Sequence, residues 1–369
     1  MSRHQIVEDS SRRAIGDDAR RRVLAGAPVT EQRWDLAGVS TAVLEAGQGP
    51  PVVLLHGQGG WAGMWLPVIP ELAKTHRVVA PDLPGLGASE APDGPPAADR
   101  VLRWLGELID RTCAAPPVLV GVSLGASIAA RFAIAHPDRL SRLVLVDAGG
   151  LGRFRPAPGL VVAMIGFIAR PTQRTQQRFL RQVAVDPAGV RAGMGERWEA
   201  SQAYYLDRAR TPSVRAANRR LLRELGTRPI PPEDLARIAA PTSLIWGRHD
   251  RVMRLRIAEA ASVRYGWPLH VIEDAGHFVM EQPGAFLGAL RPGSATADAG
   301  AAATCRAATR RDDHGSEVVG HSVVTRRAAG AWRIGTWRHR WASGSCRRWR
   351  PRTSTGSLRC CIPRWTSGA

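Results

Sequence analysis

The sequence predicts an α/β fold, with a mostly parallel sheet of about eight strands flanked by helices. Short apolar runs bounded by turn residues alternate with longer segments of helical period. Most of these runs are apolar at successive positions, as in parallel strands that are covered on both faces. The alternation spans residues 32–150, stops at a helical, strand-poor stretch, and resumes from about residue 230 to residue 291.

The predicted elements follow from these patterns in chain order. Residues 31–36 and 39–46 alternate polar and apolar side chains, which favours an antiparallel pair at a sheet edge. Later strands are expected at the continuous apolar runs, residues 52–55, 78–80, 118–120, 143–146, 244–246 and 269–272. Helices are expected between them, at residues 61–75, 98–113, 124–135, 254–265 and 283–290.

The chain divides into four parts by composition and pattern. Residues 31–150 and 230–291 are expected to form the α/β core. Residues 151–229 are Arg-rich and helical, and we interpret them as a lid inserted over the sheet. Residues 1–30 are expected to be an N-terminal extension, weakly structured or helical, and residues 292–369 to be a disordered basic tail.

The tail lacks the composition of a folded segment. Leu, Ile, Val and Phe make up about 9% of residues 292–369. A chain below about 20% cannot bury enough apolar surface to fold. The segment carries +10 of the net charge of +19 and four of the five cysteines. Its composition suggests an out-of-frame or read-through product, and the alternative is a basic arm that grips nucleic acid.

Composition limits the class and compartment of the rest. With 44% apolar and 22% charged residues, the chain is neither disordered nor collagen-like as a whole. All but one of the 51 basic residues are Arg, which suggests a coding bias, so we discount the net charge and expect no nucleic-acid partner for the core. Cys113 is the only cysteine before the tail, which excludes a disulfide framework there and favours a reducing compartment.

The N-terminal sequence contains no pattern for export. No apolar segment of signal-peptide length follows Arg12 and Arg13. The longest apolar run, residues 160–168, is too short to span a bilayer. We therefore expect a cytoplasmic protein without a transmembrane segment, and leave homo-oligomer formation open.

The strongest motif is Gly-Val-Ser-Leu-Gly at residues 121–125, directly after an apolar strand and at the start of a small-residue helix. A nucleophilic serine requires this context, because it stands in a tight strand-to-helix turn that only flanking glycines allow to close. The helix beneath contributes its positive dipole end and free N–H groups. The motif alone arises easily by chance, so its position in the sheet must support it.

That support comes from the polar residues that follow the other strands. Ligands of open α/β sheets bind beyond the carboxyl ends of the strands. Five polar positions follow predicted strands in this way: residues 56–60, residues 82–89, Ser123, Asp250 and His277. Five such coincidences favour one catalytic site at this edge.

With these motifs, residues 31–291 closely resemble the α/β-hydrolase fold family, in particular its lid-bearing serine esterase, C–C-bond hydrolase and cofactor-free haloperoxidase branches. The chain order Ser, Asp, His is that of the family's triad. Residues 246–250 resemble the family's acid-bearing turn, and residues 274–277 its histidine loop. The resemblance does not extend to the tail.

The resemblance implies a role for each residue. Ser123 would be the nucleophile, His277 the general base that takes its proton, and Asp250 the acid that holds the imidazole. The oxyanion would be stabilised by the backbone N–H groups of Leu124 and of a residue in the 56–60 loop, for which Gln58 is the candidate.

Several alternatives stay open at this point. Asp147, which also follows a strand, could supply the acid in place of Asp250. Asp82 is expected to form a turn, and His56 to brace the oxyanion loop rather than act as base. No metal-binding pattern and no nucleotide-binding glycine motif is present in the sequence, so neither a metal nor a cofactor is expected.

The reaction expected is hydrolysis of a small to medium apolar carboxylic ester or lactone through an acyl-enzyme. A serine at residue 123 argues against epoxide opening and halide displacement, because relatives with those activities carry aspartate there. The enzymatic alternatives are C–C cleavage of a ring-cleavage product, haloperoxidase or perhydrolase activity, and acyl transfer. A non-catalytic binding protein of the same fold is the alternative from another class. The substrate contacts expected are Trp61, Met164 and Phe167.

Overall fold

The computed structural model describes residues 15–91 and 98–291, together with strands at residues 306–311, 317–326 and 332–340. Its main feature is an eight-stranded sheet in the order β1-β2-β4-β3-β5-β6-β7-β8. The pairs β1–β2 and β2–β4 are antiparallel. All pairs from β4 to β8 along the sheet are parallel. The predicted fold class is therefore confirmed.

The strands coincide with the predicted runs. They are β1 (Thr30–Leu36), β2 (Val39–Ala46), β3 (Pro51–Leu55), β4 (Arg77–Pro81), β5 (Val118–Val122), β6 (Arg142–Val146), β7 (Thr242–Gly247) and β8 (Leu269–Ile272). The helical elements that flank them are η1 (Ala62–Trp65), α2 (Ile69–Leu72), α3 (Ala98–Thr112), α4 (Leu124–Ala135), α10 (Pro232–Leu235), α11 (Arg256–Tyr265), η3 (Val279–Glu281) and α12 (Pro283–Leu290).

The sheet is covered on both faces. In β3, Val53 and Leu55 pack into one hydrophobic cluster with residues of α3, α4 and α11. Val52 and Leu54, which point the other way, pack into a second cluster with residues of α2 and α12. This division explains why the strand sequences are apolar at successive positions.

The expected helix over residues 61–75 was wrong in extent. The segment forms the short 3₁₀ helix η1 and, after a break, the single turn α2. Pro67 and Pro70 explain the break, because proline lacks an N–H donor and disfavours a helical conformation at the residue before it.

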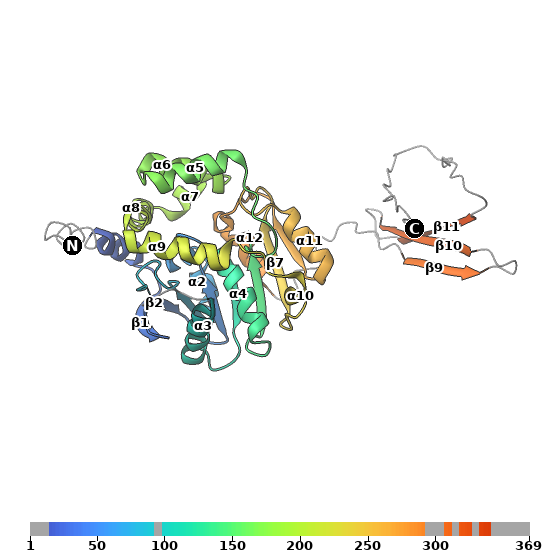
Figure 1. The fold of residues 1–369 in the computed structure, drawn as a ribbon, viewed down its shortest axis with the longest axis horizontal. Coiled ribbons are helices and arrows are strands. Elements are labelled where there is room, and N and C mark those ends of the chain that lie inside the picture. Colours follow the sequence, from blue (N-terminus) through green and yellow to red (C-terminus); the bar gives the residue numbers. More distant parts are fainter. Residues whose placement is uncertain (1–14, 92–97, 292–305, 312–316, 327–331, 341–369) are drawn as a thin grey trace. The chain divides into compact units, whose positions relative to one another are not determined.

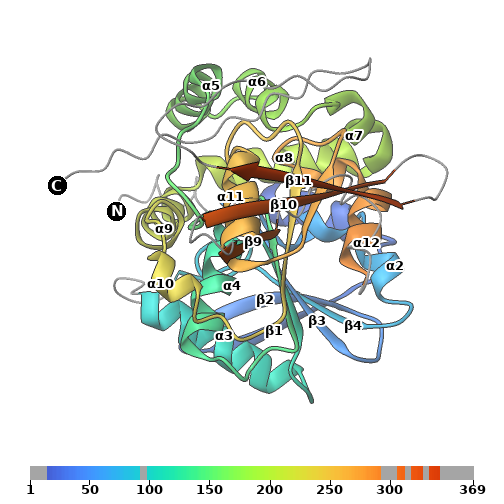
Figure 2. The ribbon, with the colours of Figure 1, turned by 90° about the vertical axis from the view of Figure 1, so that its right-hand side faces the viewer.

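The segment between β6 and β7 is helical, and we call its elements the helical insertion. They are α5 (Pro158–Ala169), α6 (Gln173–Val183), α7 (Pro187–Met194), α8 (Arg197–Arg210), α9 (Pro212–Leu221) and the π-helical turn η2 (Leu222–Gly226). Figures 1 and 2 show α5 and α6 at its outer limit, away from the strands of the eight-stranded sheet.

The N-terminal segment contains a helix at residues 15–24 that belongs to the packed core. Ala19 and Val23, four positions apart, are fully buried in the second hydrophobic cluster. The first 14 residues lie outside the described part of the chain. The extension is thus helical where it is described, and it contributes a side chain close to the site, as shown below.

The tail contains a separate three-stranded antiparallel sheet, β9 (Arg306–Arg311), β10 (Glu317–Arg326) and β11 (Trp332–Arg340), in the order β11-β10-β9. These strands differ from the expected absence of regular structure. Four of the ten residues in β10 are valine, a β-branched type that favours extended backbone. The other tail residues lie outside the described chain. Among the described helices, none combines the length and apolarity needed to cross a membrane.

Candidate active site

Ser123 occupies a strained turn between β5 and α4. Its backbone dihedrals are φ 54° and ψ −111°, which non-glycine residues rarely adopt. A Cβ at Gly121 would lie 2.4 Å from the carbonyl oxygen of Gly125, and a Cβ at Gly125 would lie 2.5 Å from that of Leu55. Both glycines of the motif are therefore required by close backbone contacts.

His277 and Asp250 form a hydrogen-bonded pair. The His277 Nδ1 atom lies 2.8 Å from Asp250 Oδ2, and the Asp250 side chain is fully buried. Asp250 Oδ1 accepts hydrogen bonds from the backbone N–H groups of Val252 (2.6 Å) and Met253 (2.9 Å), which fix the carboxylate. A carboxylate on Nδ1 places the proton there and leaves Nε2 as the basic atom.

The topology brings Ser123 to the same edge of the sheet. Strands β5, β6, β7 and β8 are parallel neighbours, so their carboxyl ends meet there. The Ser123 carbonyl oxygen accepts the N–H of Gly149, in the loop after β6 (3.0 Å). Ser123 and His277 are both described, and no hydrogen bond joins their side chains. Contact between them therefore belongs to the proposed mechanism.

Asp147, the alternative acid, lies close to Asp250, with carboxylate oxygens of the two residues within 4.8 Å of each other. Its Oδ1 accepts the N–H of Gly247 (2.9 Å), and its buried Oδ2 receives no hydrogen bond from any donor in the described residues. Burial, and then the charge of Asp250, raise the pKa of Asp147 well above its usual range. The protonated carboxyl can donate a hydrogen bond to Asp250. Asp250 is thus the acid that contacts the histidine.

Asp147, Asp250 and His277 also have the composition of a metal site, with ligand atoms all within 4.8 Å of one another. The 2.8 Å between His277 Nδ1 and Asp250 Oδ2 is, however, a hydrogen-bond length. Two ligands of one tetrahedral zinc ion, each about 2.0–2.2 Å from it, would stand roughly 3.4 Å apart. We therefore assign the cluster to proton chemistry.

His56 fixes the candidate oxyanion loop. It is fully buried, its Nδ1 donates to the carbonyl oxygen of Gly57 (2.8 Å), and its Nε2 accepts the N–H of Leu83 (2.9 Å). Burial lowers its pKa, which keeps the ring neutral. Both nitrogens are thus engaged within the scaffold, which fits a bracing role.

The loop after His56 lies against Ser123. A Cβ at Gly57 would lie 3.3 Å from Ser123 Cβ. The N–H of Gly59 is bound by Asn218 Oδ1 of α9 (3.0 Å), and that of Gly60 by the carbonyl of Gly57 (3.2 Å). Those two donors are therefore unavailable for an oxyanion, whereas exposed Gln58 stays a candidate.

Leu124 begins α4, so its N–H has no acceptor within the helix. Gln58 and Leu124 therefore stay the predicted oxyanion donors.

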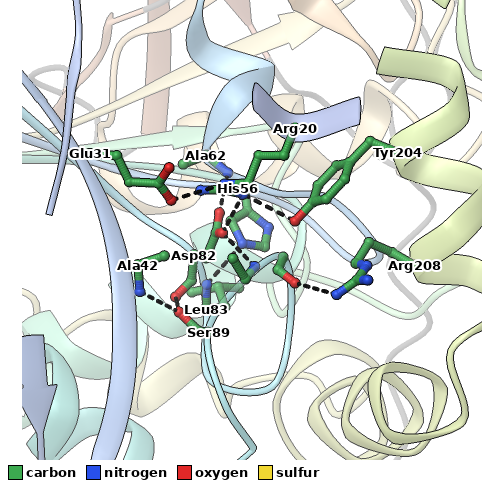
Figure 3. A network of polar contacts seen from close by, with 12 residues as sticks. Arg20, Glu31, Ala42, His56, Ala62, Asp82, Leu83, Ser89, Tyr204 and Arg208 are labelled. Carbon is green, nitrogen blue, oxygen red and sulfur yellow. Dashed lines mark hydrogen bonds and ion pairs between the residues drawn. The ribbon is translucent and has the colours of Figure 1, made fainter. Parts of the chain in front are cut away.

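Asp82 connects two loops near this site. Its Oδ1 accepts the N–H of Ala62 (2.6 Å), and its Oδ2 accepts that of Ala88 (2.7 Å) and pairs with the Arg20 guanidinium (2.8 Å). It therefore organises the loop after β4, as expected, and also holds the start of η1, which follows the oxyanion loop. Figure 3 shows this network around His56 and Asp82.

Arg20 is the residue that the sequence did not indicate. It extends from the N-terminal helix, is almost fully buried, and donates to Glu31 (2.9 Å) and to the Tyr204 hydroxyl (3.1 Å) besides pairing with Asp82 (Figure 3). Its guanidinium also stacks on the Trp61 ring at 4.5 Å. Burial opposes its charge, but Asp82, Tyr204 and Glu31 outweigh that effect and raise its pKa.

The predicted substrate contacts lie in two different places. Trp61 is buried and packs edge-on against Tyr204 of α8, with ring centroids 4.7 Å apart. Met164 and Phe167 are partly exposed on α5, where Phe167 stacks on Phe179 of α6. Their contact with substrate stays a prediction.

The helical insertion contacts two of the site loops and helix α4. Besides the bond from Gly59 to Asn218, the N–H of Phe278, next to His277, donates to Val183 of α6 (3.1 Å). On α4, Ser127 Oγ donates to the carbonyl oxygen of Leu225 in η2. The insertion is thus anchored to the loop of His277, to the loop of residues 56–60, and to helix α4, which begins directly after Ser123.

The site combines a strained serine turn, a buried acid–histidine pair and a glycine-rich loop beside the serine, at the edge of a mostly parallel sheet. This combination is typical of hydrolases. The family model described as the alpha/beta hydrolase family matches residues 52–289. The chain is 32% identical over 264 residues to 2-hydroxy-6-oxo-2,4-heptadienoate hydrolase of Pseudomonas putida. The aligned region covers 68% of this chain and 91% of that protein. The chain therefore belongs to the α/β-hydrolase family.

Other relatives differ in their named reactions. Pimeloyl-[acyl-carrier protein] methyl ester esterase of Aeromonas hydrophila is 29% identical, over 65% of this chain and 92% of that protein. Among solved structures, a meta-cleavage product hydrolase from Pseudomonas fluorescens superposes with a TM-score of 0.57 at 28% identity, covering 69% of this chain and 94% of the other. The family and a hydrolase activity are thereby supported, while the named substrates differ between relatives.

Proposed function

We propose that this chain is a serine hydrolase that cleaves small to medium, apolar carboxylic esters or lactones through an acyl-enzyme. The observation that supports it most directly is the buried Asp250–His277 pair, 2.8 Å between Oδ2 and Nδ1, at the same sheet edge as Ser123. An exposed His–carboxylate pair would be an ordinary surface contact. A pair whose acid is buried and fixed by two backbone donors is suited to orient a base.

The proposed reaction uses the side chains of Ser123, His277 and Asp250. His277 Nε2 takes the proton of Ser123 Oγ while Oγ bonds to the ester carbonyl carbon, whose π electrons move to oxygen. The tetrahedral intermediate collapses, the carbon–alkoxy bond breaks, and the leaving alcohol takes the proton from His277. Water then repeats the sequence on the acyl-enzyme, releasing the acid and restoring Ser123. Asp250 accepts the Nδ1–H hydrogen bond throughout and stabilises each imidazolium.

The oxyanion would be held by the N–H groups of Leu124 and Gln58. These donors are rigid for different reasons: Leu124 is fixed by α4, and the loop of Gln58 is held by His56 and, at Gly59, by Asn218 of the insertion. Removal of one such donor typically costs about 3 kcal/mol of transition-state stabilisation. Preorganised donors are what make an uncharged nucleophile effective at neutral pH.

Covalent labelling tests the nucleophile and separates an enzyme from a non-catalytic binding protein. We expect a fluorophosphonate to modify Ser123 and to label neither Ser123→Ala nor denatured protein. Ser127, one turn later on α4 and bound to the Leu225 carbonyl, provides a matched control: Ser127→Ala should still be labelled. A folded but unlabelled wild type would favour the non-catalytic alternative.

A second candidate reaction is supported by the names of the relatives. Several act on 2-hydroxy-6-oxo-dienoates, whose C–C bond is cleaved by water, among them the P. putida enzyme at 32% identity. Ester hydrolysis keeps first place because the residues described above suffice for it, whereas C–C cleavage also needs a donor that protonates the leaving carbon. In addition, Ser123 is followed by Leu-Gly-Ala rather than the Leu-Gly-Gly-type sequence expected of that branch.

Turnover of two substrate panels distinguishes the candidates. We expect release of p-nitrophenol from short and medium p-nitrophenyl esters, and slower or no decay of the absorbance of a dienoic keto acid. Efficient decay of the keto acid without ester turnover at any chain length would reverse the order. Labelling of Ser123 in that case would retain the serine mechanism and reject only the ester substrate.

A further inference from the structure

Helix α5, at the outer limit of the helical insertion, exposes an unusually apolar surface. Its twelve residues include no charged side chain, and Leu160 is the one that is buried. Val162, Ile165 and Ile168 are 73%, 58% and 45% exposed, and Phe154, just before the helix, is 37% exposed. Soluble monomers rarely gather large apolar side chains on one exposed helix.

Exposed arginines surround this apolar helix. Residues 151–185 contain no Asp or Glu. Arg153 and Arg155 precede α5, Arg170 follows it, and three further exposed arginines belong to α6, which packs beside it: Arg174, Arg178 and Arg181. We call Phe154, Val162, Ile165 and Ile168 together with these six arginines the α5 surface.

The combination of exposed apolar side chains and arginines distinguishes between possible binding partners of the α5 surface. A second copy docked through the same surface would bring six arginines against six, with no acid in the segment to pair with them. A nucleic acid would use the arginines but leave the exposed Val and Ile side chains without apolar partners. An anionic bilayer satisfies both, because acyl chains accept the apolar face while lipid phosphates accept the guanidinium groups.

We propose that the α5 surface docks on anionic phospholipid bilayers, with α5 lying in the membrane interface. The arrangement allows this, because Figures 1 and 2 place α5 and α6 on the side of the insertion away from the sheet. The bonds from the insertion to the site loops and to α4 come from the last residue of α6 (Val183), from α9 (Asn218) and from η2 (Leu225). Docking would thus place the hydrolase site next to a source of apolar esters without disturbing the sheet.

Vesicle co-sedimentation of the full chain tests the proposal. We expect binding to phosphatidylcholine vesicles that contain phosphatidylglycerol, and little binding to phosphatidylcholine alone. The double variant Val162→Asp/Ile165→Asp should lower the partition coefficient by more than about tenfold, because two side chains that insert are replaced by anions. Val263→Asp is the matched control, since Val263 is an 88% exposed apolar residue on α11, outside the α5 surface.

The contribution of the arginines to membrane binding is tested with separate variants. Replacing Arg174 and Arg178 with Gln should weaken binding by roughly fivefold for each arginine. Arg103→Gln, at an exposed position on α3, is the matched control. It should weaken binding only by the small effect of lowering the net charge by one. Circular dichroism and thermal unfolding of each variant establish that it is folded.

Three outcomes would overturn the proposal. One is absence of binding to the anionic vesicles. A second is binding that Val162→Asp/Ile165→Asp reduces no more than Val263→Asp does, because attraction would then come from another basic part such as residues 292–369. The third is a wild-type protein that does not bind vesicles and forms a dimer, seen by light scattering, which Ile165→Asp dissociates. The α5 surface would then be an interface between two copies of the chain.

Discussion

Two residues of the site hold backbone conformations that their side chains disfavour. Ser123 has φ 54° and Asp147 has φ 41°, and each directly follows a parallel strand, β5 and β6. Such strain persists only where surrounding contacts overdetermine it. For Ser123 these contacts are its N–H bond to Val146 and its carbonyl bonds from Ser127 and Gly149. Both strained residues thus stand at the carboxyl ends of neighbouring parallel strands, the edge of the sheet where Asp250 and His277 meet.

The two acids should behave in opposite ways when they are converted to amides. Asp147→Asn can still accept the N–H of Gly247 and donate to Asp250, so we expect kcat within a few-fold of wild type. Asp250→Asn would present a donor to His277 Nδ1 and favour the wrong tautomer, at a cost of about four orders of magnitude in kcat. Steady-state ester kinetics measure both. Equal losses in the two variants would make Asp147 a member of the triad.

The same Asp147 variant predicts a pH dependence of stability. The raised pKa of Asp147 means that, above the ordinary pKa of about 3.9, the folded state holds a proton that the unfolded state releases. Wild-type stability should therefore fall as pH rises through this window, up to the raised pKa. Asp147→Asn has no such proton, so the stability of this variant relative to wild type, measured by urea unfolding, should increase as pH rises through the same window. A constant difference would contradict the assignment.

The glycines of the serine turn can be tested by adding one methyl group. At Gly125, the new Cβ would meet the backbone oxygens of Leu55 and His56 at 2.5 and 2.6 Å, and backbone cannot move aside cheaply. We expect Gly125→Ala to lose more than about 2 kcal/mol of stability and most fluorophosphonate labelling. Gly106→Ala, on α3, meets only Phe132 at 3.8 Å and should be neutral or stabilising. Equal effects would remove the steric explanation.

At the scale of elements, sequence periodicity was sufficient for the sheet and insufficient for the N-terminal helix. The runs that became β3 to β8 could be predicted because burial on both faces leaves a continuous apolar sequence. Ala19 and Val23 do carry a helical spacing, but Arg20 between them gave no signal. A buried arginine is recognisable only when its partners are known, and Asp82 and Tyr204 lie 62 and 184 positions further along the chain.

The candidate acid shows the same limit. Asp147 and Asp250 both follow strands, and only the resemblance of residues 246–250 to the family's acid-bearing turn favoured Asp250. The decision comes from tertiary geometry, since the loop after β7 presents Asp250 to Nδ1 at 2.8 Å while Asp147 is bound to Gly247. The sequence predicted the edge of the sheet and the residue types, and packing determined the pairing.

Arg20 should couple the N-terminal helix to the site. Replacing it with Met leaves the buried Asp82 carboxylate without its cation, and loss of one member of a buried pair typically costs about 3–5 kcal/mol. Because Asp82 also holds the N–H of Ala62 beyond the oxyanion loop, we expect slower labelling of Ser123 under conditions where the variant is folded. Thermal unfolding and labelling rates provide the two measurements.

Arg21 is the matched control on the same helix. Its side chain is 71% exposed and pairs with Asp18 at the surface, so Arg21→Met should change stability by no more than about 0.5 kcal/mol. Arg20→Lys, which restores a charge but not the forked geometry, should fall between wild type and Arg20→Met. A stable Arg20→Met with unchanged labelling would show that the helix packs without supporting the site.

At the scale of the whole molecule, stability arises from two hydrophobic clusters on opposite faces of one sheet. Their members run from Ala19 to Leu290, and the segment from residue 297 onward forms a separate unit by its contacts. The contribution of residues 292–369 to net charge is large and their apolar content is small. The hydrolase part should therefore fold and work without them.

A chain that ends at Arg291 tests this separation. It keeps the bond from Arg142 to the Leu290 carbonyl, which ties the last helix to β6 (2.7 Å). We expect its unfolding temperature to stay within about 2 °C of the full chain and its kcat/KM for esters to be unchanged, because no member of either cluster is removed. Salt-sensitive retention on DNA, if the full chain shows it, should disappear with the +10 charge of the tail. Retention that survives truncation would assign it to the arginines of the hydrolase part, and loss of turnover would mean that the tail supports the fold despite its composition.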